Sequence, residues 1–202
     1  MKVTRAMITV LFFGGLFFAA TAHGGDIKGK VSETGLKSEE NIVVYIDAIP
    51  GKKFDAPAQH AAVDQRDLKF VPETVVIQRG GTVDFLNSDH VAHNVRWSSV
   101  SGDKSLAGNL VSISPGQKKS FEFDHVGTAT ILCNYHFDMK GYVVIVPTPY
   151  FALTSHDGTF TIKNVPAGTY MLKTWSPDGK PTTQSITVTD VPTNVEVALV
   201  KN

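Results

Sequence analysis

The residues with the clearest chemistry lie in one short segment, Cys133-Asn134-Tyr135-His136-Phe137-Asp138-Met139, which contains the only cysteine of the sequence. A thiol, an imidazole and a thioether follow one another there at three-residue intervals. A second imidazole, His93, lies upstream in His93-Asn94-Val95. Two histidines, one cysteine and a weak axial methionine are the ligands of a mononuclear blue copper ion. The set therefore predicts one type 1 copper per chain, which would cycle between Cu(I) and Cu(II) and carry a single electron.

Each of these residues has a commoner structural role when it is considered alone. A free cysteine is most often a small buried hydrophobe, and Met139 would usually be part of a core. His90, three residues before His93, is a rival ligand. The order of the four residues favours metal binding, with His93, Cys133, His136 and Met139 as the predicted ligands.

The elements that must position these residues are predicted to be β-strands. Downstream of the N-terminal segment there is almost no helical periodicity, and short β-rich runs alternate with Gly, Pro, Asn and Asp. The run Thr128–Leu132 leads into Cys133, and Tyr142–Val146 follows the loop. His93 comes just after Phe85-Leu86-Asn87, at the end of another predicted strand. These ligands can converge at one pole of a β-sandwich, so we expect an all-β fold.

Three more strands are predicted in the same region, at Thr74–Gln78, Thr82–Leu86 and Lys119–Phe123. The remaining predicted strands indicate a second sandwich. They are Asp26–Val31 and Asn41–Ile49 near the start, and Tyr150–Thr154, Thr159–Ile162, Thr169–Trp175, Gln184–Thr189 and Asn194–Val200 in the tail. The tail alone would leave unpaired sheet edges, so we expect the first two strands to complete it. This predicts a discontinuous β-sandwich of residues 23–61 and 148–202, into which a copper domain of residues 62–147 is inserted. Alternatively, the first strands join the copper domain.

The N-terminus has the features of an export signal, and the composition limits the possible partners. Lys2 and Arg5 precede an apolar run, and Ala20-Thr21-Ala22 provides a small-residue cleavage site, so residues 1–22 are predicted to be a signal peptide. The mature protein is expected to be periplasmic or secreted, without a membrane span. With 19 basic and 19 acidic residues the formal net charge is zero. The sequence has no run of like charges that would favour binding to nucleic acid or to an anionic membrane. Because the net charge is zero, a partner must be recognised by a local surface patch.

The middle of the chain resembles a cupredoxin of the plastocyanin and amicyanin type. The matching residues are Val83-Asp84-Phe85-Leu86-Asn87, His93-Asn94-Val95, the segment from Cys133 to Met139, and Gly141-Tyr142-Val143. The Cys-x-x-His-x-x-Met spacing is that of the short amicyanin ligand loop. The resemblance implies a Greek-key sandwich with copper bound by His93, Cys133, His136 and Met139. It also implies that Asn94 hydrogen-bonds across to the cysteine loop.

Two departures from the family pattern leave the reduction potential open. Asp138 is acidic beside the predicted axial methionine, and Phe137 stands where a proline is common. The flanking segments resemble carboxypeptidase-regulatory or prealbumin-like modules. That resemblance rests on Asp157-Gly158-Thr159-Phe160 and Val165-Pro166-Ala167-Gly168-Thr169-Tyr170.

These features predict a non-enzymatic electron carrier. A redox protein would dock over the loop around His136, with Tyr135 and Phe137 as an apolar contact. The cupredoxin resemblance implies that the electron would pass through the exposed edge of His136. Two other interpretations stay open. One is a copper module for delivery, storage or sensing, and the other is an interaction protein whose copper is structural.

Overall fold

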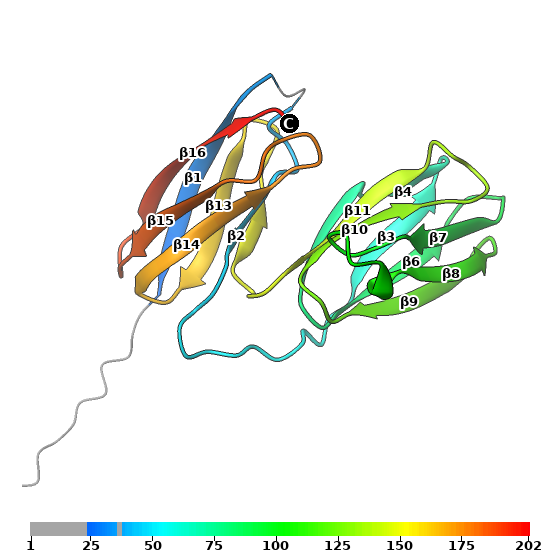
Figure 1. Ribbon diagram of the computed structural model, residues 1–202, viewed down its shortest axis with the longest axis horizontal. Helices are drawn as coiled ribbons and strands as arrows, with labels where there is room; N and C mark the ends of the chain where they lie inside the picture. Colours follow the sequence, from blue (N-terminus) through cyan, green and yellow to red (C-terminus); the bar gives the residue numbers. More distant parts are fainter. Residues whose placement is uncertain (1–23, 36–37) are drawn as a thin grey trace, which may run out of the picture.

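The structure is a computed structural model that describes residues 24–35 and 38–202, and it is built from β-strands (Figure 1). The expected all-β fold is confirmed. The predicted signal peptide lies outside the described residues. The strands are β1 (Gly25–Thr34), β2 (Val43–Ile46), β3 (Ala61–Arg66), β4 (Lys69–Val71), β5 (Thr74–Gln78), β6 (Gly81–Asn87), β7 (His93–Trp97), β8 (Gly108–Ile113), β9 (Lys118–Phe123), β10 (Gly127–Leu132), β11 (Lys140–Val146), β12 (Phe151–Leu153), β13 (Thr159–Val165), β14 (Gly168–Trp175), β15 (Thr183–Val188) and β16 (Thr193–Val200). A short 3-10 helix, η1 (Lys104–Leu106), precedes β8.

Strands β3 to β11 form one sandwich, here called the central sandwich. Its two sheets have the strand orders β5-β11-β10-β7-β8 and β4-β3-β6-β9. Strand β6 illustrates why the sheets pack face to face, since Val83 and Phe85 are fully buried and alternate with partly exposed Thr82, Asp84 and Leu86. The core between the sheets includes Trp97, Phe123, Ile131 and Ile145 together with Cys133 and Met139.

The remaining strands form a second sandwich, here called the terminal sandwich. Its sheets have the orders β13-β1-β16 and β12-β2-β14-β15. Strand β1 thus lies between two strands from the end of the chain, and in Figure 1 the blue β1 runs beside the red β16. Strand β2 pairs with β12 and β14. The two N-terminal strands therefore pair with the tail, as expected, and not with the central sandwich.

Gly29 shows how closely the terminal sandwich is packed. It faces Phe160 on one side and Val195 on the other in the strand ladder. A Cβ atom at this position would lie 2.6 Å from Cζ of Phe160 and 2.5 Å from the carbonyl oxygen of Val195. Glycine is therefore the residue that lets the Phe160 ring cross β1 and join the core.

An apolar seam joins the two sandwiches. The outer face of β11 contributes Tyr142, Val144 and Val146, and Val43 of β2 is buried against them. The Trp175 ring of β14 meets the Tyr142 ring edge to face, with centroids 5.2 Å apart. Because the other face of β11 belongs to the central core, β11 is covered on both sides. Separating the sandwiches would expose these apolar side chains to water.

Among the residues that the structure describes, no helix has both the length and the apolar character needed to cross a membrane.

Candidate metal centre

The structure brings three of the four predicted ligand residues together at one pole of the central sandwich. His93 begins β7, Cys133 directly follows β10, and His136 lies on the loop to β11. Their candidate ligand atoms all lie within 4.8 Å of one another. The Cys133 Sγ atom is 3.9 Å from Nδ1 of His93 and 3.8 Å from Nδ1 of His136. The two Nδ1 atoms are 3.0 Å apart.

These separations fit a small soft or borderline metal ion. Nitrogen and sulfur ligands bind such ions at about 2.0–2.3 Å, so three of them in a trigonal plane lie about 3.5–4 Å from one another. Both sulfur–nitrogen distances are in that range, and the nitrogen–nitrogen distance is slightly shorter. A thiol and two imidazole nitrogens that converge in this way present lone pairs to one point, which a cation would satisfy. His2Cys is the trigonal donor set of blue copper.

Asp89 holds the His93 imidazole. Its Oδ2 lies 2.8 Å from Nε2 of His93, and its carboxylate also accepts the backbone N–H groups of Asp67 at 2.7 Å and Leu68 at 3.0 Å. Burial alone would raise the pKa of Asp89, but the hydrogen bonds from the Leu68 amide, the His93 ring and the Asp67 amide lower it. An ionised Asp89 accepts a hydrogen bond from the Nε2–H group of His93, so the ring proton stays on Nε2 and the Nδ1 lone pair is directed at the centre.

The loop from Cys133 to Met139 is closed by its own backbone. The Cys133 N–H donates to the Met139 carbonyl at 3.3 Å, and the Met139 N–H donates to the His136 carbonyl at 3.0 Å. Cys133 is 2% exposed and Met139 is 1% exposed, and both belong to the central core. The hairpin of β10 and β11 therefore presents a short, compact loop whose two ends are buried.

Asn94 connects this loop to β7, as the cupredoxin resemblance implies. Its Oδ1 accepts the backbone N–H of Asn134 at 3.2 Å. Its own amide nitrogen donates to Oδ1 of Asn109 at 2.7 Å and to the Val111 carbonyl at 3.2 Å. A buried side chain with these partners has a defined orientation, so Asn94 holds the strand that begins with His93 against the loop that carries Cys133.

The loop from Cys133 to Met139 exposes two aromatic side chains to solvent. Phe137 is 88% exposed and Tyr135 is 53% exposed, whereas His136 between them is half-buried. His90, the rival ligand, is exposed and does not belong to the three-residue group. The structure thus separates the buried His93 from the exposed His90 and leaves His136 partly exposed.

Two residues that contact the predicted ligands or their loop were not found by sequence analysis. Asp89 lies four residues before His93, and a carboxylate near a predicted metal-binding histidine is a usable signal because such histidines commonly donate their second ring N–H to one. Arg96, whose Nε donates to Oδ1 of Asn134, has no comparable local signal, since 38 residues separate the two in sequence.

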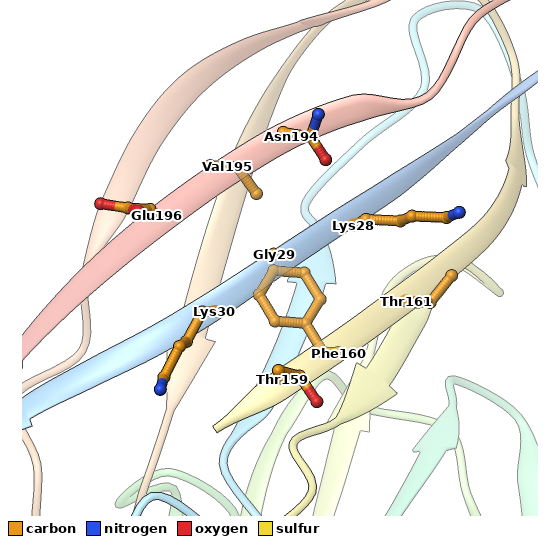
Figure 2. A pocket seen from close by; sticks show the side chains of 9 residues that line it. All are labelled: Lys28, Gly29, Lys30, Thr159, Phe160, Thr161, Asn194, Val195 and Glu196. Carbon is orange, nitrogen blue, oxygen red and sulfur yellow. The ribbon is translucent and has the colours of Figure 1, made fainter. Parts of the chain in front are cut away.

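A hollow lies away from this centre, on the β13-β1-β16 sheet of the terminal sandwich (Figure 2). Its side chains are mostly polar, and Figure 2 shows Lys28 and Lys30 on either side of Gly29. Glu196 is its single carboxylate, and no histidine, cysteine or methionine lines it. It therefore lacks the soft donors that the centre at His93 and Cys133 provides.

Comparisons with known proteins match the two sandwiches separately. Residues 57–146 match the model of the copper binding proteins of the plastocyanin/azurin family. Residues 148–194 match domain II of polysaccharide lyase family 4. Amicyanin-alpha from Methylorubrum extorquens is 33% identical over 92 residues, which cover 45% of this chain and 76% of that protein. Amicyanin from Paracoccus versutus is 25% identical over 116 residues, which cover 57% of this chain and 86% of that protein.

Solved structures of related domains give weaker likenesses. A reduced tryptophan-to-tyrosine mutant of amicyanin aligns with a TM-score of 0.40 and 24% identity, covering 45% of this chain and 86% of that one. A copper-containing nitrite reductase from Thermus scotoductus aligns with a TM-score of 0.42 and 19% identity, covering 58% of this chain and 28% of that one. The sequence match to amicyanin-alpha, and not these alignments, decides the relationship. This chain belongs to the plastocyanin/azurin family of copper binding proteins, and copper is the cofactor that fits its centre.

Proposed function

We propose that this protein is an exported type 1 copper protein that carries single electrons in the periplasm or outside the cell. His93, Cys133 and His136 are the proposed trigonal ligands, and Met139 is the proposed axial ligand. The observation that carries the proposal is the convergence of one thiol and two imidazole Nδ1 atoms at a buried point, 3.0–3.9 Å apart, under an apolar rim. Amicyanin relatives support the same function.

Copper held there would supply one-electron chemistry between its Cu(I) and Cu(II) states. The protein residues bind it and limit rearrangement. Asp89 orients His93, Asn94 ties β7 to the ligand loop, and the backbone bonds between Cys133 and Met139 close that loop. A site held by such contacts keeps its ligands in place when the charge of the metal changes. His136, half-buried and set between exposed aromatic side chains, is the proposed point of electron exit.

We further propose that the chain consists of two domains. A copper domain is inserted into a discontinuous sandwich, which we compare with carboxypeptidase-regulatory or prealbumin-like modules. The sequence predicted the copper domain as residues 62–147, but because β3 begins at Ala61 we place its start one residue earlier. Separate cores in the two sandwiches support this division. The apolar seam at Tyr142 and Trp175 packs the two domains against each other.

The role of Met139 is tested by the Met139→Gln variant. Copper should be retained, because the three trigonal ligands provide most of the bonding, and the reduction potential should fall. An amide oxygen is a harder ligand than a thioether and favours Cu(II) over Cu(I). Met171→Gln is a matched control, since Met171 is 44% exposed on the terminal sandwich. Electrochemistry of both variants decides the question, and equal potentials in Met139→Gln and the unchanged protein would assign Met139 to core packing alone.

The docking surface is tested by the Phe137→Asp variant. Electron self-exchange between oxidised and reduced copies, measured by NMR line broadening, should slow about tenfold or more, because an aromatic anchor at an interface is commonly worth about 2 kcal/mol. The blue spectrum should be nearly unchanged, since Phe137 is 88% exposed and is not a ligand. Removal of residues 1–22, which contain Lys2 and Arg5 and no acidic residue, would leave 17 basic and 19 acidic residues and a formal net charge of −2. With so small a net charge, exchange in the unchanged protein should depend only mildly on salt.

The matched control for this surface is Val191→Asp, which adds the same charge at a residue 60% exposed on the terminal sandwich. It should leave the exchange rate unaltered. If Phe137→Asp exchanged electrons as fast as the control, the electron would have to enter by another surface.

A further inference from the structure

We propose that Arg96 is a positioning residue for the ligand loop, and that its guanidinium also raises the reduction potential of the copper. Arg96 would act through Asn134, the residue that follows Cys133. The part that concerns the potential rests on the proposed copper function, whereas the part that concerns the loop can be tested without metal.

Strand geometry brings Arg96 to the start of the loop. Side chains alternate along β7, so Asn94 and Arg96 point away from the core that receives His93. Arg96 is the β7 residue that pairs with Leu132, the last residue of β10. Cys133, the first residue of the ligand loop, directly follows Leu132. Arg96 therefore lies beside the junction between a rigid strand and the loop.

Asn134 is held at two of its atoms by the same strand. Its backbone N–H donates to Oδ1 of Asn94 at 3.2 Å, and its side-chain Oδ1 accepts a hydrogen bond from Nε of Arg96. Asn134 itself is exposed, so burial does not restrain it. Hydrogen bonds with two alternate residues of β7 thus restrict both the backbone and the side chain of Asn134. This restraint is applied one residue away from the thiolate.

The charge of Arg96 has a predictable effect on the metal. A guanidinium stays protonated throughout the working pH range. Within the described residues, no carboxylate forms an ion pair with Arg96. The oxidised centre carries one more positive charge than the reduced centre. A cation that contacts the ligand loop at Asn134 and forms no such ion pair therefore disfavours the oxidised state and raises the reduction potential.

The loop restraint is tested on the full-length, copper-free protein by amide hydrogen exchange at residue 134. Arg96→Gln and Asn134→Ala should each accelerate exchange by about tenfold, since a hydrogen bond to a charged group contributes about 1.5 kcal/mol or more. The double variant should exchange no faster than the faster single variant, because both changes remove the same contact. Arg66→Gln, which changes the same charge at an exposed residue of β3, should leave exchange unaltered. Unaltered exchange in Arg96→Gln, or fully additive effects in the double variant, would overturn the positioning role.

The charge is tested by the reduction potentials of the copper-loaded variants. Arg96→Gln should have a lower potential than the unchanged protein and than Arg66→Gln, whereas Arg96→Lys, which keeps the charge but not the Nε donor, should restore most of the difference. A potential in Arg96→Gln equal to that of Arg66→Gln would overturn the electrostatic role. An unmutated protein that binds copper without a blue band would instead refute the proposed function, while the copper-free exchange data would still test the restraint.

Discussion

The Cys133→Ser variant is expected to lose the blue charge-transfer band completely while it keeps the β-fold. The band of a type 1 site arises from electron transfer out of a thiolate into Cu(II), and Cys133 is the only source of a thiolate in the chain. Serine has nearly the same shape, so the buried position, which is 2% exposed, is not emptied. Absorption spectroscopy after copper loading measures the first effect, and circular dichroism measures the second.

The free energy of unfolding of Cys133→Ser should change little compared with the loss of the blue band. A buried hydroxyl without a hydrogen-bond partner costs about 1–3 kcal/mol, which a packed sandwich of this size can tolerate. A Cys133→Ser protein that remained blue would show that the metal centre lies elsewhere. A variant that lost its β-structure would require the comparison to be repeated with Cys133→Ala, for which the same loss of colour is expected.

The second large effect is expected from His93→Ala, which should lose copper affinity by more than about 100-fold. Replacing a residue that only supports a ligand commonly costs 10–100-fold, and removal of the ligand itself should cost more. His93 is fully buried and its Nδ1 lies 3.9 Å from the sulfur of Cys133. The change also removes a hydrogen-bond partner of Asp89. Competition with a copper chelator measures the affinity.

The control is His90→Ala, which should keep both the affinity and the blue spectrum. His90 is an imidazole of the same segment, but its side chain is exposed and outside the converging group. Loss of colour in His90→Ala together with its retention in His93→Ala would reverse the assignment of the upstream ligand.

That Cys133, His136 and Met139 share one loop could be predicted from the sequence because the loop is local, whereas the role of Met139 as a ligand stays a prediction. Cys133, His136 and Met139 lie within one hairpin, so their spacing alone determines that they share a turn between β10 and β11. The pairing of the N-terminal strands with the tail was also predictable, since it follows from the number of strands that a closed sandwich needs.

Other strands of the central sandwich were missed because their patterns are broken by polar or irregular residues. Strand β3 buries Gln65 in place of an apolar residue, and β7 places the polar Asn94 at a buried position. In β8, Val111 has a positive φ of 53° and is 60% exposed, which interrupts the alternation. Strands β7 and β8 lie beside the metal centre, since His93 of β7 pairs with Ile113 of β8. Polar side chains that hold the site replace apolar ones there, so the hydrophobic alternation of these strands is weaker.

The contacts that complete the site and the seam depend on residues far apart in sequence. The bond from Arg96 to Asn134 and the packing of Trp175 on Tyr142 have no local signature. One clue was present in β11, whose run Tyr142-Val143-Val144-Ile145-Val146 is apolar at successive positions. Such a run indicates a strand buried on both faces, and the terminal sandwich provides the second cover.

The measurement that tests the account most directly is a redox titration of the copper-loaded, full-length protein followed by visible absorption. We expect one copper per chain, an intense thiolate-to-copper band in the oxidised form, complete bleaching by one electron per chain, and full recovery on reoxidation. Copper bound without that band, or a band that one electron neither removes nor restores, would contradict the proposal that this protein carries electrons at a type 1 site.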